Sequence, residues 1–384
     1  MRYGKNKLSI HFLILKIMKT IFLVAGSRAG IEFFQSLLED HPQILQLPGV
    51  VQTNKNFIDI VSHKKHSDIS SNFIKHFPHF FDSRLNNMER HYMLGEKKNE
   101  YYLVDKEKFT KNFAKLFNDQ SKLNINNQLF RNIIMIHLAY SLSCGHNIDK
   151  KKIMIINCHL IDNIKYIAEK ISEIDFDIIH SIRNPLSAVS SPVNNWLKYE
   201  NGKHFFAKSI YFQLNLITNA IKQLKKIKKN FFIVQLERLH KNHLDVMTDF
   251  CKTYDLNYDN CMENSTYFNL KWWGDKVSGK DLNGVDKNFK ATYIEKTFYK
   301  RDIKFIEYVL SDYIKFYGYE FTEKKTKINY NFLPMKSEIL TWKNTVKHKK
   351  IKHIFSIPFY YIKRLLFVNK FSQKNLKMPH SFGL

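Results

Sequence analysis

Two groups of residues have the types and spacing that suit binding of an anion. The first is the turn Ala-Gly-Ser-Arg-Ala-Gly at residues 25–30, between the apolar run 21–24 and a helical pattern that begins at Ile31. A small-residue turn between a strand and a helix directs backbone N–H groups and the positive end of the helix toward a ligand. Arg28 adds a fixed cation. A phosphate or a sulfate is the natural ligand of such a turn.

The second group is Arg183-Asn184-Pro185, which follows the apolar run 177–182. Asn184 can cap a helix and Pro185 can occupy its first position. Arg183 would then stand at the carboxyl end of a strand, where open α/β sheets bind ligands. Ser191 lies further along the same helix. A guanidinium and a hydroxyl can hold the same phosphate, so this pair predicts a second phosphate subsite.

The first turn does not match the common nucleotide-binding loops. A nucleoside triphosphatase loop needs Lys followed by Ser or Thr after its last glycine, whereas Gly30 is followed by Ile31 and Glu32. The three glycines of a dinucleotide fingerprint are also absent at the required spacing. An anion site of a different kind is therefore indicated.

Together the two groups resemble the sulfotransferase family that uses 3′-phosphoadenosine 5′-phosphosulfate (PAPS). In that family a strand leads into Arg-Ser-Gly-Thr-Thr, then a helix with paired leucines, then His-Pro, and a later Arg-Asp-Pro is followed by a serine. The matching residues are Arg28, Gly30, Leu37, Leu38, His41, Pro42, Arg183, Pro185 and Ser191. The departures are Ala29, Ile31, Glu32 and Asn184.

The resemblance implies a P-loop-like sulfotransferase fold and a set of cofactor contacts, with no metal required. It implies that the turn holds the 5′-phosphosulfate, that Arg183 and Ser191 hold the 3′-phosphate, and that a late basic loop closes over that phosphate. The turn residues concerned are Ser27, Arg28, Ala29, Gly30, Ile31 and Glu32, and the late loop is Ser278-Gly279-Lys280.

Glu32 has two interpretations. A carboxylate beside a bound anion repels it, so Glu32 either points away and favours the start of the helix or serves as general base for an acceptor hydroxyl. The family's usual glutamate base cannot be carried over, because residues 46–52 contain no acidic residue. We expect that stretch to shape the acceptor pocket, with Arg28 and Glu32 as the catalytic candidates.

Alternating elements position these residues. Apolar runs at 153–157, 177–182 and 231–237 alternate with helical patterns, which predicts a parallel sheet flanked by helices in one α/β domain, residues 19–320. Residues 321–384 form a basic, partly amphipathic tail that suits either an anionic lipid surface or docking on its own domain. The aromatic pair Trp272-Trp273 suits either stacking on adenine or anchoring a loop.

Composition narrows the class of protein. The net charge is +26, but the lysines are spread along the chain, which argues against a nucleic-acid-binding protein. The four cysteines lack CxxC spacing, which favours a reduced, cytoplasmic protein, at most peripheral to the inner face of a membrane. The apolar stretch 8–18 is interrupted by His11 and Lys16, so we expect the domain to start near Met18 rather than after a membrane span.

The sequence therefore predicts transfer of a sulfuryl group from PAPS to a hydroxyl or amine acceptor, with a saccharide or lipid headgroup as the expected acceptor class. Two alternatives stay open. One is an ATP-dependent, kinase-like transferase. The other is a basic protein that binds membrane or nucleic acid on a degenerate sulfotransferase scaffold.

Overall fold

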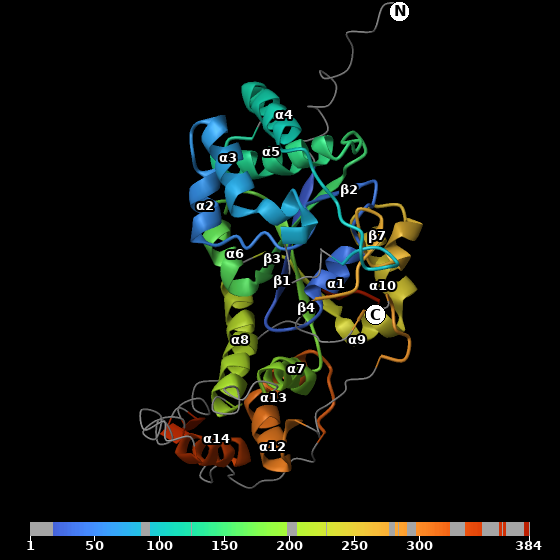
Figure 1. The fold of residues 1–384 in the computed structure, drawn as a ribbon. Coiled ribbons are helices and arrows are strands. Elements are labelled where there is room, and N and C mark those ends of the chain that lie inside the picture. The colour runs from blue at the N-terminus through green and yellow to red at the C-terminus, as the bar shows by residue number, and fades with distance from the viewer. Residues whose placement is uncertain are drawn as a thin grey trace, which may run out of the picture.

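The protein is built around a six-stranded parallel sheet with strand order β2-β3-β1-β4-β5-β8 (Figure 1). The computed structural model describes residues 18–85, 93–123, 125–197, 206–227, 229–275, 281–282, 284–289, 297–322, 335–347, 361–362, 364–365 and 380–383. The strands are β1 (Lys19–Ala25), β2 (Ile44–Gln46), β3 (Ile153–Leu160), β4 (Phe176–Ile182), β5 (Phe231–Gln235) and β8 (His380–Ser381). The predicted fold class, a parallel sheet flanked by helices, is confirmed.

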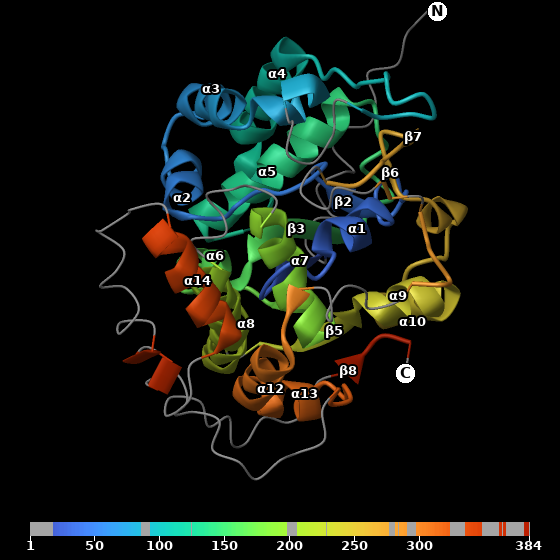
Figure 2. The same cartoon turned by 60° about the horizontal axis from the view of Figure 1, so that its bottom comes forward.

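Helices cover both faces of the sheet. One side carries α1 (Ile31–Ser36), α9 (Leu236–Lys241) and α10 (His243–Thr253), and the other carries α6 (Ile161–Ala168) and α8 (Phe206–Lys226), as Figures 1 and 2 show. The central strand β1 is therefore buried on both faces, and its residues Ile21, Phe22, Leu23 and Val24 have no exposed surface. A continuous apolar run is what a central parallel strand requires.

Two helical groups lie at opposite ends of the molecule in Figure 1. The upper group contains α2 (Lys55–Val61), α3 (His66–His76), α4 (Lys106–Asn118) and α5 (Gln128–Ser143). The lower group contains α7 (Pro185–Leu197), α12 (Lys300–Val309), α13 (Ser311–Phe316) and α14 (Lys336–Lys347). Strands β6 (Thr266–Tyr267) and β7 (Leu270–Lys271) form a short separate hairpin.

The strand register gathers three loops at one edge, which we call the carboxyl edge. Ala25, the last residue of β1, pairs with Leu160 of β3 and with Ser181 of β4. The chain leaves β1 toward β2 on one side and leaves β4 toward β5 on the other. This divergence is the arrangement at which open α/β sheets bind their ligands.

The helical patterns of the sequence are interrupted in two places. The pattern that begins at Ile31 gives a short helix, because α1 ends at Ser36 and Asp40 adopts a left-handed φ of 62° in the turn that follows. The helical pattern at 297–317 forms two helices, α12 and α13, which meet at Leu310. The expected cap at Asn184 is confirmed, because its Oδ1 accepts a hydrogen bond of 3.1 Å from the N–H of Ser187.

Parts of the tail pack on the domain. Helix α14 packs against α8 and α12, and Nε of the buried Arg364 forms an ion pair with Oε1 of Glu338 at 3.1 Å. Strand β8 extends the sheet beyond β5. In the part of the chain that the structure describes, no helix combines the length and apolarity needed to cross a membrane.

Buried histidines predict a loss of stability in acid. Burial lowers the pKa of His137 to about 4 and that of His180 to about 3, from 6.5. The unfolded chain binds more protons than the folded one below about pH 6.5, so the free energy of unfolding should fall as pH drops toward about 4. Urea unfolding at neutral and at mildly acidic pH measures this fall. His137→Leu should show a shallower fall, whereas an unchanged slope would contradict this assignment.

Candidate functional site

The loop after β1 is tightly enclosed, and its glycines are required by that packing. Gly30 has a φ of 76°, and a Cβ there would lie 2.5 Å from Cδ1 of Leu236, the first residue of α9. A Cβ on Gly26 would lie 2.8 Å from Cβ of Ala220 in α8. Because the loop is pressed between α8 and α9, side-chain-bearing residues cannot replace these glycines without strain.

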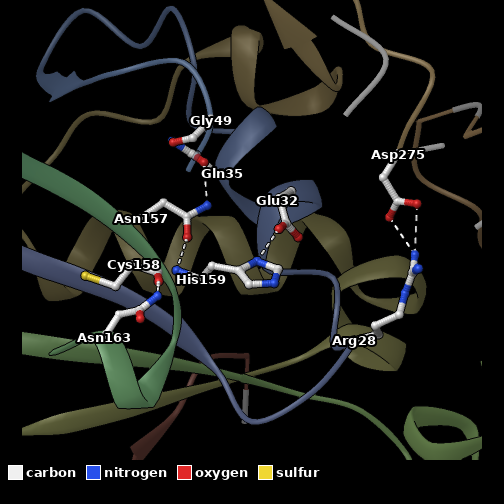
Figure 3. Close-up of polar contacts among 9 residues, drawn as sticks. All are labelled: Arg28, Glu32, Gln35, Gly49, Asn157, Cys158, His159, Asn163 and Asp275. Carbon is white, nitrogen blue, oxygen red and sulfur yellow. Dashed lines mark hydrogen bonds and ion pairs between the residues drawn. The ribbon is translucent and has the colours of Figure 1, made fainter. Parts of the chain in front are cut away.

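Arg28 is held in place by an acidic side chain. Its Nη2 donates to both carboxylate oxygens of Asp275, at 2.9 and 2.7 Å (Figure 3). A guanidinium has five N–H donors, and those on Nε and Nη1 of Arg28 have no acceptor among the described residues. The loop therefore carries a fixed, partly exposed cation with donors left for a further anion.

Three other loop residues have side chains that are buried in the protein. The hydroxyl of Ser27 donates to Oε1 of Gln213 at 2.8 Å, and the side chain of Ile31 is buried. Ala29 is also buried, and its carbonyl accepts from Ser181 Oγ at 2.6 Å. The contribution of Ser27, Ala29 and Ile31 to an anion site is thus limited to backbone groups.

Glu32 pairs with a histidine that the sequence analysis did not identify. Its Oε1 lies 2.5 Å from Nδ1 of His159, at the end of β3 (Figure 3). The β1–β3 register skips Cys158, and His159 has a left-handed φ of 62°. Such a bulge redirects a side chain, and strained positions of this kind concentrate at functional sites. His159 keeps 40% of its side chain exposed, whereas Glu32 keeps 16%.

A hydrogen-bonded chain supports this pair (Figure 3). The N–H of His159 donates to Oδ1 of Asn157 at 2.9 Å, and Nδ2 of Asn157 donates to Oε1 of Gln35 at 2.6 Å. Nε2 of Gln35 in turn donates to the carbonyls of Leu47 and Gly49, at 2.9 and 3.0 Å. The segment after β2 is therefore fixed to the end of β3, which is where the sequence analysis expected the acceptor pocket.

The ionisation of Glu32 determines what His159 can do. Burial pushes the pKa of Glu32 upward, but His159, the Glu32 backbone N–H and Arg28 together hold it below its usual value. An ionised carboxylate only accepts hydrogen bonds, so Nδ1 of His159 carries the proton in this contact. When the ring is neutral, Nε2 is its basic nitrogen, which is the arrangement of a general base.

Arg183 lies on the other side of β1, directly after β4. Burial lowers its pKa, Glu237 raises it and the nearby Arg28 lowers it. Glu237 is engaged elsewhere, since its oxygens accept from the N–H of Asn184 at 2.7 Å and from Tyr319 Oη at 3.1 Å. Among the described residues, the buried Nε of Arg183 has no hydrogen-bond partner. The carboxyl edge therefore holds a second cation whose hydrogen-bonding capacity is not satisfied.

The remaining candidates are less central in the structure. Ser191 lies partly exposed on α7, and Ser278, Gly279 and Lys280 lie outside the described residues.

The two neighbouring tryptophans pack on the protein. Trp272 is buried against Tyr267, at a ring distance of 5.5 Å. Trp273 Nε1 donates to Gly95 O at 2.7 Å, and its ring is approached by the ammonium groups of Lys98 and Lys271. Both tryptophans thus anchor the loop, the second of the two roles considered for them.

A separate cavity of about 210 Å³ lies away from these residues. Its lining includes Ile44, Gln46, Ser141 and Lys151. Ile44 pairs with Ile153, the first residue of β3, so this cavity lies toward the amino ends of the strands. The anion-binding candidates lie at the opposite edge of the sheet, because they follow the last residues of the strands.

Comparisons with known proteins give a fold-level similarity. No protein-family model matches the sequence, and no curated protein matches it. Among solved structures, the chain is similar to the sulfotransferase domain from the curacin biosynthetic pathway, over 86% of this chain and 98% of that chain, with 10% sequence identity and a TM-score of 0.34. At this TM-score the similarity carries no argument about activity, and the assignment of a parallel α/β fold stands on the sheet described above.

The Glu32–His159 contact makes a prediction about acid–base properties. His159→Ala should raise the pKa of Glu32 above its usual value, because burial then acts without its main opposing partner. Carbon-13 NMR titration of the glutamate carboxyls measures the shift, and the exposed His63→Ala provides a control. An unmoved Glu32 resonance in His159→Ala would mean that the pair does not interact in solution.

Proposed function

We propose that this protein transfers a sulfuryl group from PAPS to a hydroxyl or amine acceptor. The observation that carries the proposal is the state of Arg183. Its guanidinium is partly buried at the carboxyl edge, its Nε has no hydrogen-bond partner in the part of the chain that the structure describes, and Arg28 is near enough to lower its pKa. Arg28 and Arg183 repel each other at the carboxyl edge, and an anion with two separated charges would stabilise both. A nucleotide with a 3′-phosphate and a 5′-phosphosulfate has this charge distribution.

The chain's residues fit such a cofactor at both ends. Arg183 would hold the 3′-phosphate, with the hydroxyl of Ser191 as second donor. Arg28 would hold the 5′-phosphosulfate through Nε and Nη1, while Asp275 keeps its Nη2. The backbone N–H groups of Gly30 and Ile31 would add to this second contact, whereas the N–H of Glu32 is engaged by the carboxylate of Glu32. The fit does not extend to the Ser27 hydroxyl, which is engaged by Gln213.

PAPS supplies an activated sulfuryl group joined to the 5′-phosphate, and transfer breaks that S–O bond. The chain's contribution is positioning and charge, because such a reaction needs in-line geometry and stabilisation of the leaving oxygen. Arg28 would face the leaving phosphate. His159 would accept the acceptor's proton at Nε2, and Glu32 would hold the ring through Nδ1. The sequence interpretation of Glu32 as the base is thereby refined, with Glu32 as a positioning residue.

The acceptor belongs on the side of the edge bounded by residues 47–51, because Gln35 and Asn157 fix this segment beside His159. We propose a saccharide or lipid headgroup as acceptor class. A net charge of +26 favours anionic surfaces. We propose a cytoplasmic protein, as the cysteine pattern suggested, in peripheral contact with anionic lipid.

The cofactor assignment predicts a difference between two arginine variants. Arg183→Ala should weaken binding of adenosine 3′,5′-bisphosphate by about tenfold or more, as expected for loss of a charge-assisted contact. Arg84→Ala should leave the affinity unchanged, because Arg84 pairs with Asp82 on the exposed surface. Isothermal titration calorimetry measures both. Equal affinities in wild type and Arg183→Ala would contradict the proposal.

The base assignment predicts a loss of turnover without loss of cofactor binding. His159→Asn should slow release of adenosine 3′,5′-bisphosphate from PAPS by about a hundredfold in the presence of a hydroxyl acceptor panel, the usual effect of removing a general base. The dissociation constant of the bisphosphate should stay the same, since His159 is not a cofactor contact. If affinity and turnover fell together, His159 would instead belong to the cofactor subsite.

A further inference from the structure

The outermost strand of the sheet is contributed by a short segment from the far end of the chain. In β8, His380 pairs with Phe232 and Ser381 pairs with Ile233, both parallel to β5. The N–H of Phe382 donates to the carbonyl of Ile233 at 3.1 Å. Addition of an extended segment to a free sheet edge is the geometry by which many domains bind peptides.

An aromatic side chain anchors this segment. Phe382 is 1% exposed, and its ring stacks on that of Phe232 at 5.5 Å and 12°. The ring of Phe250 meets it edge-on at 5.7 Å, and the ring of Tyr254 lies at 6.5 Å in a tilted orientation. The pocket between β5 and α10 is thus shaped for one aromatic ring.

The residue after the anchor is recognised through its backbone. Gly383 has a φ of 74°, and a Cβ there would lie 2.8 Å from Cγ2 of Val246. Its N–H donates to Oδ2 of Asp249 at 2.9 Å, an oxygen that also lies 3.1 Å from Nε2 of His380. Its carbonyl accepts from Nη2 of Arg238. The groove therefore selects an aromatic residue followed by glycine.

Helix α9 connects this groove to the carboxyl edge. Arg238, which donates to the carbonyl of Gly383, is the third residue of α9. The two residues before it contact the candidate site: Leu236 packs against Gly30, and Glu237 accepts from the N–H of Asn184, beside Arg183. A change in the position of α9 would therefore move side chains that contact both anion subsites.

We propose that β5, α9 and α10 form a peptide-docking site, that the chain fills it with its own residues 380–383, and that this docking sets the anion affinity of the carboxyl edge through α9. The docking itself stands on the contacts above, whereas the effect on anion affinity rests on the proposed function. The ligand class is an extended peptide carrying an aromatic–glycine pair.

Peptide binding tests the docking site. A fluorescent peptide with the sequence of residues 376–384 is titrated into full-length wild type, Phe382→Ala and Gly383→Ala, each checked for folding by circular dichroism. The wild-type groove is already filled, so the peptide should bind the two variants about tenfold more tightly than wild type. The same peptide with alanine in place of the phenylalanine should not bind. Gly383→Ala keeps the aromatic anchor and decides the question if Phe382→Ala fails to fold. Equal binding to wild type and to folded variants, or none to either, would overturn the proposal.

Calorimetry with adenosine 3′,5′-bisphosphate tests the coupling. Both variants should bind the bisphosphate about threefold more weakly than wild type, and saturating peptide should restore the affinity. Unchanged affinity in both variants would overturn the coupling. If wild type binds no bisphosphate, the proposed function fails, while the peptide titration still decides whether the docking site exists.

Discussion

Parallel pairing of β1 with β3 on one side and with β4 on the other is the constraint on which the candidate site depends. It brings the end of β1 level with Leu160 and with Ser181. The loop with Arg28, the bulge at His159 and the turn with Arg183 therefore meet at one edge, although they are far apart in sequence. The burial of β1 on both faces fixes the register, because a slip would change which residues face each helical layer.

The electrostatics of this edge differ between its two cations. Arg28 is directly paired with Asp275. Glu237 is the acid that raises the pKa of Arg183, but its carboxylate accepts hydrogen bonds from the backbone N–H of Asn184 and the hydroxyl of Tyr319. This arrangement orients the turn around Arg183 without satisfying its guanidinium. Arg28 is therefore directly bonded to an acid, whereas among the described residues Arg183 has an acid nearby but no hydrogen bond at its Nε.

Local patterns in the sequence predicted part of the fold. The apolar runs indicated the strands β1, β3, β4 and β5, and the Asn-Pro pair indicated the cap of α7 and the position of Arg183. The pairing of His159 with Glu32 could not be read from the sequence, since a bulge at Cys158 turns the histidine toward a residue far away in the chain. The only local signal was a histidine shortly after the apolar run 153–157. The inward hydroxyl of Ser27 likewise depends on Gln213, a residue of a distant helix. Strand β8 has no local apolar run, and its place is set by the pocket for Phe382.

The most direct test of the central claim is calorimetric titration of the wild-type protein with adenosine 3′,5′-bisphosphate, compared with ADP with and without Mg²⁺. The two nucleotides separate the contribution of a 3′-phosphate from that of a diphosphate. The account predicts tight binding of the bisphosphate, independent of Mg²⁺ and much tighter than that of ADP. Preferential binding of ADP with Mg²⁺ would contradict it in favour of an ATP-dependent transferase, and absence of binding to both nucleotides would contradict it in favour of a basic scaffold.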